Sequence, residues 1–203
     1  MTRAESRSEA PAPQRPRVGP EFFEDLYAHD EDPWGFARRD YEREKYRHTL
    51  AALGDARFAR GLEVGCSIGV LTEQLATVCH ELVGIDVSAR ALALAQRRLG
   101  GAAGVSVRRM SFPEQMPDGH WDLVVCSEVL YYLDPPAFAR ALERLAAVLD
   151  GGGAVLAVHW RPATSTYPLR GDEVHDRMLA ALGGAHVLDD RRPRYRLDLL
   201  QGR

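Results

Sequence analysis

A loop of small residues follows the first apolar segment of the chain and has the composition of a ligand-binding turn. The segment from Glu63 to Gly69 reads EVGCSIG, with Gly65 and Ser67 at alternate positions before the last glycine. Small side chains let the backbone turn sharply and approach a ligand closely. A helix is expected directly after the loop, so the unpaired amide groups of its first turn would point at whatever is bound there.

Two ligand classes use such a loop, and the spacing separates them. Counted from Gly65, a dinucleotide fingerprint would need glycine where Ser67 and Val70 stand. The loop of S-adenosylmethionine-binding enzymes instead carries an acid and then small residues at every second position. The sequence matches that pattern except at Ser67, whose hydroxyl can cap the helix or bind the methionine carboxylate. The predicted cofactor is S-adenosylmethionine, and the loop residues predicted to bind it are Glu63, Gly65, Cys66, Ser67 and Gly69.

An acid at the end of the second expected strand fits the same cofactor. Asp86 stands seventeen residues after Gly69, where the segment 81–85 ends. A carboxylate at this position can accept hydrogen bonds from both ribose hydroxyls. Alone, Asp86 is equally consistent with a carboxylate that caps a helix or a turn. Paired with the loop, it predicts the ribose site, and we include the adjacent Val87 among the cofactor-binding residues.

The third and fourth expected strands also end in polar residues. After segment 105–109, Ser111 can reach the adenine amino group and Phe112 can lie against the adenine ring, although Ser111 is also consistent with a plain loop serine. After segment 121–126, Ser127 is expected beside the methionine moiety. These three residues join the predicted cofactor site because parallel strands bring their carboxyl ends to one edge of the sheet.

The fourth strand end also supplies candidates for the chemistry on the acceptor. Glu128 can orient the acceptor, bind the cofactor or cap a turn, and the sequence leaves these roles open. Of the neighbouring tyrosines Tyr131 and Tyr132, alternation suggests that one contacts substrate and the other packs in the core. We take Glu128 and Tyr131 as candidate catalytic residues.

A third catalytic candidate, His159, stands where the fifth expected strand ends. It is predicted to act as a base or to orient the substrate, the alternative being a structural histidine. Next to it, Trp160 can stack on a sugar and Arg161 can hold an anionic acceptor, or both can serve packing and solubility. Asp172 and His175 share a helix face and suggest either sugar contact or a capping acid beside a surface histidine. No cluster of cysteine and histidine has metal-ligand spacing, so no metal is predicted.

The elements that must position these residues alternate between short apolar runs and amphipathic stretches. Such alternation is typical of a parallel sheet with helices on both faces. The expected strands cover residues 62–64, 81–85, 105–109, 121–126 and 154–159, with two more near 185–188 and 195–200. The expected helices cover residues 68–78, 88–99, 134–149 and 171–182.

The N-terminal part is expected to cover the site. Residues 20–53 are predicted to be helical with a break at Asp32–Gly35, where proline and glycine interrupt the pattern. Trp34 and Arg38 are predicted to contact the cofactor from this lid, although Trp34 can instead only fasten the lid to the core. Residues 1–19 have little to bury and are predicted to form a disordered tail, which leaves residues 20–203 as a single domain.

Composition excludes several other classes of function. The net charge of −3 gives no basic field for nucleic acid. No apolar run approaches the ~18 residues that span a bilayer. The three cysteines fit free thiols in a reducing compartment, so a cytoplasmic location is expected. The expected partner is a small-molecule acceptor, with neither nucleic acid nor membrane, and the chain is expected to be a monomer or a weak homodimer.

Residues 61–159 together resemble the class I S-adenosylmethionine-dependent methyltransferases. A closer resemblance, to the NodS family, extends over nearly all of residues 20–200. It is carried by the segments DPWGF, YEREKY, GCSIGVLTEQLA, SEVLYYL, AVHWR and YPLRGDEVH.

The class I resemblance implies a Rossmann-like α/β fold with a seven-stranded, mostly parallel sheet, helices on both faces and an N-terminal helical lid. The NodS resemblance implies N-methylation of the free amino sugar at the non-reducing end of chitin-like oligosaccharides made by rhizobia. It also implies that the serine at position 67 is a feature of this subgroup. Two alternatives stay open: an O-methyltransferase acting on a hydroxyl or carboxylate of a small metabolite, and a non-catalytic S-adenosylmethionine-binding subunit.

Overall fold

The apolar runs of the sequence form one seven-stranded sheet in the computed structural model, which describes residues 16–164 and 166–202. The strand order is β3-β2-β1-β4-β5-β7-β6. The first five strands pair in parallel, whereas β7 pairs antiparallel with both β5 and β6. The predicted seven-stranded, mostly parallel sheet is confirmed. The strands are β1 (Phe58–Val64), β2 (Cys79–Asp86), β3 (Val105–Arg109), β4 (Leu123–Ser127), β5 (Ala154–Trp160), β6 (Ala185–Arg191) and β7 (Tyr195–Gln201).

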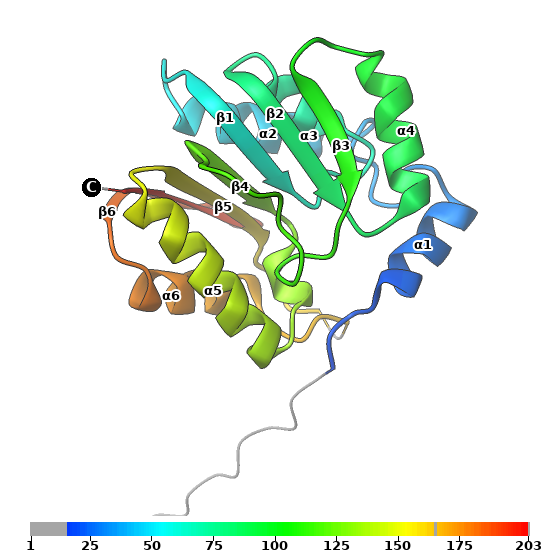
Figure 1. The fold of residues 1–203 in the computed structure, drawn as a ribbon. Helices are drawn as coiled ribbons and strands as arrows, with labels where there is room; N and C mark the ends of the chain where they lie inside the picture. The colour runs from blue at the N-terminus through cyan, green and yellow to red at the C-terminus, as the bar shows by residue number, and fades with distance from the viewer. Residues whose placement is uncertain (1–15, 165, 203) are drawn as a thin grey trace, which may run out of the picture.

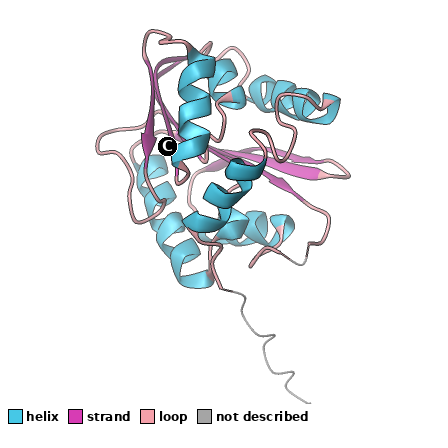
Figure 2. Cartoon of the chain, turned by 90° about the vertical axis from the view of Figure 1, so that its right-hand side faces the viewer, coloured by secondary structure: helices cyan, strands magenta, loops and turns pink. Residues whose placement is uncertain are grey.

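Helices cover both faces of the twisted sheet (Figures 1 and 2). On one face, α5 and α6 bury apolar side chains such as Leu145 and Met178 against the inner residues of β1, β4 and β5. On the other face, α2 and α3 pack against Leu82, Leu123 and Leu156. The helices are α1 (Pro20–His29), α2 (Asp40–Ala52), α3 (Val70–Leu75), α4 (Ala89–Leu99), α5 (Pro135–Asp150) and α6 (Gly171–Ala181), with a short 3-10 helix η1 (Leu130–Tyr132).

Local signals explain where most of these elements begin. The Ser88 side chain accepts from Ala91 N–H at the start of α4, and the Asp134 side chain accepts from Ala137 N–H at the start of α5. The helix expected at 68–78 is shorter, because Gly69 takes a left-handed conformation at φ +79° and delays the start of α3 to Val70. The chain then turns after Leu75 and enters β2 at Cys79.

The N-terminal boundary differs from the one predicted. Residues 1–15 of the expected tail lie outside the described residues. The next residues, however, are bound to the fold: Val18 N–H donates to the Tyr132 carbonyl at 3.1 Å. The Arg17 guanidinium donates to the Phe112 carbonyl at 2.8 Å. The composition of the tail did not reveal these contacts because each depends on partners about a hundred residues away.

Candidate functional site

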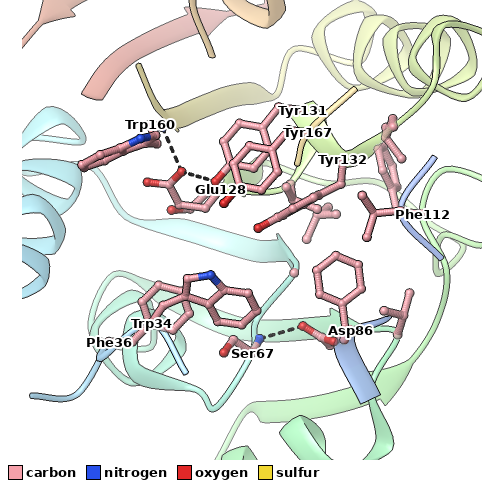
Figure 3. A pocket seen from close by; sticks show the side chains of 18 of the residues that line it. Trp34, Phe36, Ser67, Asp86, Phe112, Glu128, Tyr131, Tyr132, Trp160 and Tyr167 are labelled. Atoms are coloured by element: carbon pink, nitrogen blue, oxygen red, sulfur yellow. Dashed lines mark hydrogen bonds between the residues drawn. The ribbon is translucent and has the colours of Figure 1, made fainter. Parts of the chain in front are cut away.

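A cavity of about 330 Å³ opens at the carboxyl ends of β1, β2 and β4, beneath the N-terminal helices. Its size is that of a small-molecule site. One wall carries Ser67 and Asp86, and the other carries Glu128, Tyr131 and Trp160 (Figure 3). We call these walls the Asp86 half and the Glu128 half.

The Asp86 half is organised by hydrogen bonds between a backbone loop and one carboxylate. Ser67 N–H donates to Asp86 Oδ2 at 2.9 Å, and Ser88 N–H donates to Asp86 Oδ1 at 2.9 Å. Burial raises the pKa of Asp86. Asp86 therefore shapes the turn and also lines the cavity with Gly65, Ser67 and Val87. Both roles considered for it from the sequence are compatible with this position.

Glu63, Cys66 and Gly69 were predicted to bind the cofactor, but the structure places none of them on the wall of this cavity. The carboxylate of Glu63 is buried and accepts from Thr72 Oγ1 at 2.5 Å, and burial raises its pKa to about 8. Gly69 lies against α4, because a Cβ there would come within 3.1 Å of the Ala95 side chain. Glu63 and Cys66 instead line a second, smaller pocket that shares Gly65, Ser67 and Glu128 with this cavity, so their contact with the cofactor stays a prediction.

The end of β3 is covered by the N-terminal segment. Phe112 lines the cavity as expected, together with Met110 and Arg17. Ser111 does not line it, and Arg17 Nη2 donates to its hydroxyl at 3.1 Å. That hydroxyl keeps a proton to donate, so the contact of Ser111 with the cofactor stays a prediction. Arg17 was missed because it stands in a stretch whose composition is that of a tail.

The lid contributes aromatic side chains. Trp34 lines the cavity and stacks on Phe36 with ring centroids 5.5 Å apart. Arg38 does not line it: its side chain is 63% exposed and pairs with Asp30 and Asp32 at 3.3 Å. Arg39 lines the cavity instead. The structure thus places Arg39, rather than the predicted Arg38, on the cavity wall.

Glu128 is the polar centre of the second half. Its Oε2 accepts from the Tyr131 hydroxyl at 2.6 Å and from Trp160 N–H at 2.8 Å. Its Oε1 accepts from Lys45 Nζ at 2.6 Å. The backbone of Glu128 has φ +56°, a left-handed conformation that is unfavourable for a residue with a Cβ. Figure 3 shows the carboxylate between Trp160 and Tyr131.

Lys45 joins two acids in the wall of the Glu128 half. Its side chain is 2% exposed and lies 2.8 Å from Glu42 Oε2 as well as 2.6 Å from Glu128 Oε1. Burial opposes its charge, but the two carboxylates outweigh burial and raise the pKa of Lys45. Sequence reasoning missed Lys45 and Glu42, although their spacing of three residues on one expected helix face was visible in YEREKY.

Both tyrosines of η1 line the cavity and both are buried, so the predicted division of roles between them is not found. Tyr131 stacks on Tyr167 with ring centroids 4.4 Å apart and an interplanar angle of 8°. Tyr132 meets Tyr167 edge-on at 4.6 Å. Ser127 lines the cavity beside them, as expected.

The structure places His159 outside the cavity, so its predicted role as a base that touches substrate is not supported by its position. The ring is fully buried and lies between Leu130 N–H and His175. His175 is buried too, rather than a surface histidine. Trp160 lines the cavity. Arg161 does not line it, and its Nε atom lies 2.8 Å from Asp172 Oδ1.

Two further observations concern only the part of the chain that the structure describes. Within residues 16–164 and 166–202, no group of histidine, cysteine, aspartate and glutamate side chains is arranged to hold a metal ion. No helix in those ranges has the length and apolar character needed to cross a membrane.

Comparisons with known proteins agree with this architecture. The profile of the NodS family (Nodulation protein S) matches residues 22–162. Nodulation protein S of Sinorhizobium fredii is 35% identical over 130 residues, which are 61% of this chain and 58% of that protein. Ubiquinone biosynthesis O-methyltransferase of Bordetella avium is 32% identical over 133 residues, which are 62% of this chain and 54% of that protein. The chain therefore spans between half and three fifths of the length of these relatives.

A solved structure extends the match to almost the whole chain. The N-methyltransferase NodS from Bradyrhizobium japonicum WM9, in complex with S-adenosyl-L-homocysteine, aligns with a TM-score of 0.80 at 25% identity. The alignment covers 91% of this chain and 99% of that one. The sheet order and the position of the cavity are those of the class I methyltransferase fold. Within that class, the chain belongs to the NodS family.

Proposed function

We propose that this chain is an S-adenosylmethionine-dependent methyltransferase that methylates the nitrogen of a small amine, such as an amino sugar. The observation that carries the proposal is the buried cluster of Glu42, Lys45 and Glu128 in the cavity wall. All three residues line the cavity, and Figure 3 shows Glu128 on the wall opposite Ser67 and Asp86. The cavity thus offers a cofactor half and an acceptor half.

The Asp86 half has the donor set that the cofactor requires. Both oxygens of Asp86 accept backbone N–H groups, and the carboxylate keeps acceptor capacity for ribose hydroxyls. Met110 and Phe112 offer apolar surface to a flat ring, and Gly65 lets the backbone approach closely. S-adenosylmethionine, when bound, supplies an activated methyl group on a positively charged sulfur.

The Glu128 half has a charge balance that suits an amine. Two carboxylates and one ammonium give the cluster a formal charge of −1. An amine nitrogen becomes positively charged as it is methylated, so a fixed negative charge beside it stabilises the transition state more than the ground state. Glu128 Oε1 has a lone pair that Lys45 does not use, and it can accept a hydrogen bond from the amine N–H.

The aromatic walls support a ring-shaped acceptor. Trp160, Tyr131 and Tyr167 line the Glu128 half, and the last two stack face to face. Aromatic side chains of this kind provide large, rigid apolar surfaces with polar edges, a combination that suits a ring with hydroxyl groups. The similarity to the N-methyltransferase NodS from Bradyrhizobium japonicum WM9 supports the same chemistry.

O-methylation is the second candidate, because the chain is also similar to an O-methyltransferase of ubiquinone biosynthesis. A hydroxyl acceptor must lose its proton on methylation, so it needs a base within hydrogen-bond reach. Glu128 at the acceptor wall can accept a hydrogen bond, but taking up the proton of a hydroxyl would neutralise the carboxylate that balances the buried Lys45. We therefore favour the amine, which can attack in its neutral form without prior deprotonation.

The test is product analysis with a ¹³C-methyl-labelled cofactor. The acceptors are a chitin oligosaccharide with a free amine at its non-reducing end, the fully acetylated oligosaccharide and a catechol. An N-methyl resonance with the free amine alone supports the proposal. An O-methyl product from the catechol would replace it with the second candidate. Tight binding of the cofactor without transfer to any of these acceptors or to a wider panel of amines and hydroxyls would favour a non-catalytic binding subunit.

A further inference from the structure

A chain of buried polar side chains runs beneath the Glu128 half without entering the cavity. His159, His175 and Asp198 each have no exposed surface. His159 Nδ1 lies 3.1 Å from His175 Nε2, and His175 Nδ1 lies 2.5 Å from Asp198 Oδ2. At its upper end, Leu130 N–H donates to His159 Nε2 at 3.2 Å. We call His159, His175 and Asp198 the histidine relay.

The partners of the relay fix the direction of every hydrogen bond in it. A backbone N–H can only donate, so His159 Nε2 must be unprotonated to accept from Leu130. A neutral His159 then carries its proton on Nδ1 and donates to His175 Nε2. His175 in turn carries a proton on Nδ1 and donates to Asp198. Burial, His175 and Lys45 lower the pKa of His159, which keeps the ring neutral.

The lower end of the relay is anchored by charge. Asp198 Oδ2 lies 2.8 Å from Arg196 Nε, and Asp198 Oδ1 lies 2.7 Å from His186 Nε2. Arg196 is itself fully buried and donates to Asp176 at 2.6 Å. Asp198 therefore stays a carboxylate and an acceptor, and hydrogen bonds from its histidine partners keep its pKa low although burial opposes this. The acceptor at this end orients His175, and His175 orients His159.

The upper end of the relay holds the turn that carries the acceptor-side residues. Consecutive residues of β5 bind this turn: the Val158 carbonyl accepts from Glu128 N–H at 2.8 Å. The His159 ring accepts from Leu130 N–H, and Trp160 N–H donates to Glu128 Oε2 at 2.8 Å. The left-handed conformation of Glu128 persists only if its surroundings hold it there. The ring of Tyr131 also lies edge-on to His159, with centroids 5.2 Å apart.

We propose that the histidine relay is a positioning device, in which His159 holds the turn at Leu130 and so sets the orientation of Glu128 and Tyr131 toward the acceptor. His159 is then a positioning residue rather than a base, in agreement with its place outside the cavity lining. The proposal rests on the proposed function for its kinetic consequence, but the direction of the hydrogen bonds is independent of that function.

The kinetic test compares three variants with methyl transfer to the amine acceptor. His159→Leu removes the acceptor for Leu130 N–H and should lower kcat about 100-fold, the effect of displacing catalytic groups by about 1 Å. Binding of S-adenosylhomocysteine should stay within about threefold, because the Asp86 half does not touch the relay. His159→Gln places an amide oxygen near the position of Nε2 and should restore most of kcat. His120→Gln, at an exposed histidine remote from the cavity, should behave like the wild type.

A His159→Leu variant with unchanged kcat would overturn the proposal, as would equal losses in kcat and in cofactor affinity.

Should that variant fail to fold, the protonation state of the two histidine rings in the wild type tests the proposal. Nitrogen NMR of the ¹⁵N-histidine-labelled wild type should show His159 and His175 both protonated on Nδ1 and not on Nε2. A proton on Nε2 of His159 would contradict the relay. A wild type without transferase activity would reject the proposed function, and the tautomer result would still support or overturn the relay.

Discussion

The two halves of the cavity are assembled in different ways. The Asp86 half is local: Ser67 and Asp86 are 19 residues apart, and the loop between β1 and α3 binds the carboxylate through its backbone. The Glu128 half is non-local: Lys45 stands 83 residues from Glu128, and the two meet only because α2 packs over the end of β4. The first half depends on loop geometry, whereas the second depends on the balance of buried charges.

This difference has energetic consequences. A loop that binds a carboxylate through backbone N–H groups keeps those donors when a side chain is replaced. A buried cluster of Glu42, Lys45 and Glu128 loses its compensation when Lys45 is removed. Removing this cation should therefore affect folding, whereas a substitution of Asp86 should affect ligand affinity.

The largest effect is expected for Lys45→Met. The variant leaves Glu42 and Glu128 buried without their cation, and breaking a buried pair in this way costs about 3–5 kcal/mol. Urea denaturation measures the free energy of unfolding. The double variant Glu42→Gln/Lys45→Met should recover part of the loss, because one of the uncompensated charges is gone. A loss of less than about 1 kcal/mol in the single variant, the level of a surface pair, would contradict the buried cluster.

The next effect is on turnover. Glu128→Gln keeps the shape of the side chain but removes the negative charge beside the acceptor, so kcat should fall by about 10²–10³-fold. Glu143 on α5 is exposed, and Glu143→Gln is the matched control that should leave kcat unchanged. Steady-state kinetics with the amine acceptor give both values. Equal kcat in the two glutamine variants would remove Glu128 from the reaction.

A smaller effect is expected on cofactor affinity. Asp86→Ala removes the acceptor for the ribose hydroxyls and should weaken binding by about 1.5–3 kcal/mol, as for hydrogen bonds to a charged group. Calorimetry with S-adenosylhomocysteine measures it, and Asp118→Ala at an exposed turn serves as control. An affinity equal to that of the wild type would reject the ribose assignment.

The smallest effect is expected for Arg38→Ala. Its side chain is 63% exposed and pairs with Asp30 and Asp32, and it does not line the cavity. Because an exposed pair contributes about 1 kcal/mol or less, cofactor affinity should stay within about threefold. A larger loss in the same calorimetric titration would restore Arg38 to the cofactor site and alter the boundary of the Asp86 half.

The sequence predicted the fold and part of the lining of the Asp86 half, because both depend on short-range patterns. Alternating apolar runs specify the parallel strands, and the spacing from Gly69 to Asp86 places a carboxylate beside the loop. Ser67, Asp86, Phe112 and Ser127 all line the cavity as expected. Glu63 and Cys66 share the motif but do not line this cavity, a difference that spacing alone does not encode.

The Glu128 half was only partly predictable because its partners meet in the tertiary structure. Lys45 is read from the sequence as one more charge on a polar helix, and only packing against β4 makes it a buried cation. His159 was expected in the cavity because it ends a strand, but β5 is buried on both faces, so alternation does not tell which side chains face the ligand. The positions of Arg17 and Arg39 on the cavity wall depend on the path of the backbone through the N-terminal segment.

The most direct test of the separation between the halves is to measure cofactor affinity and kcat side by side for Asp86→Ala and Glu128→Gln. We predict that Asp86→Ala weakens binding of S-adenosylhomocysteine by about 10–150-fold, equivalent to the hydrogen-bond energy above. Glu128→Gln should bind it as the wild type does and yet lose most of its kcat with the amine. Equal weakening of cofactor binding in both variants would contradict the division of the cavity into a cofactor half and an acceptor half.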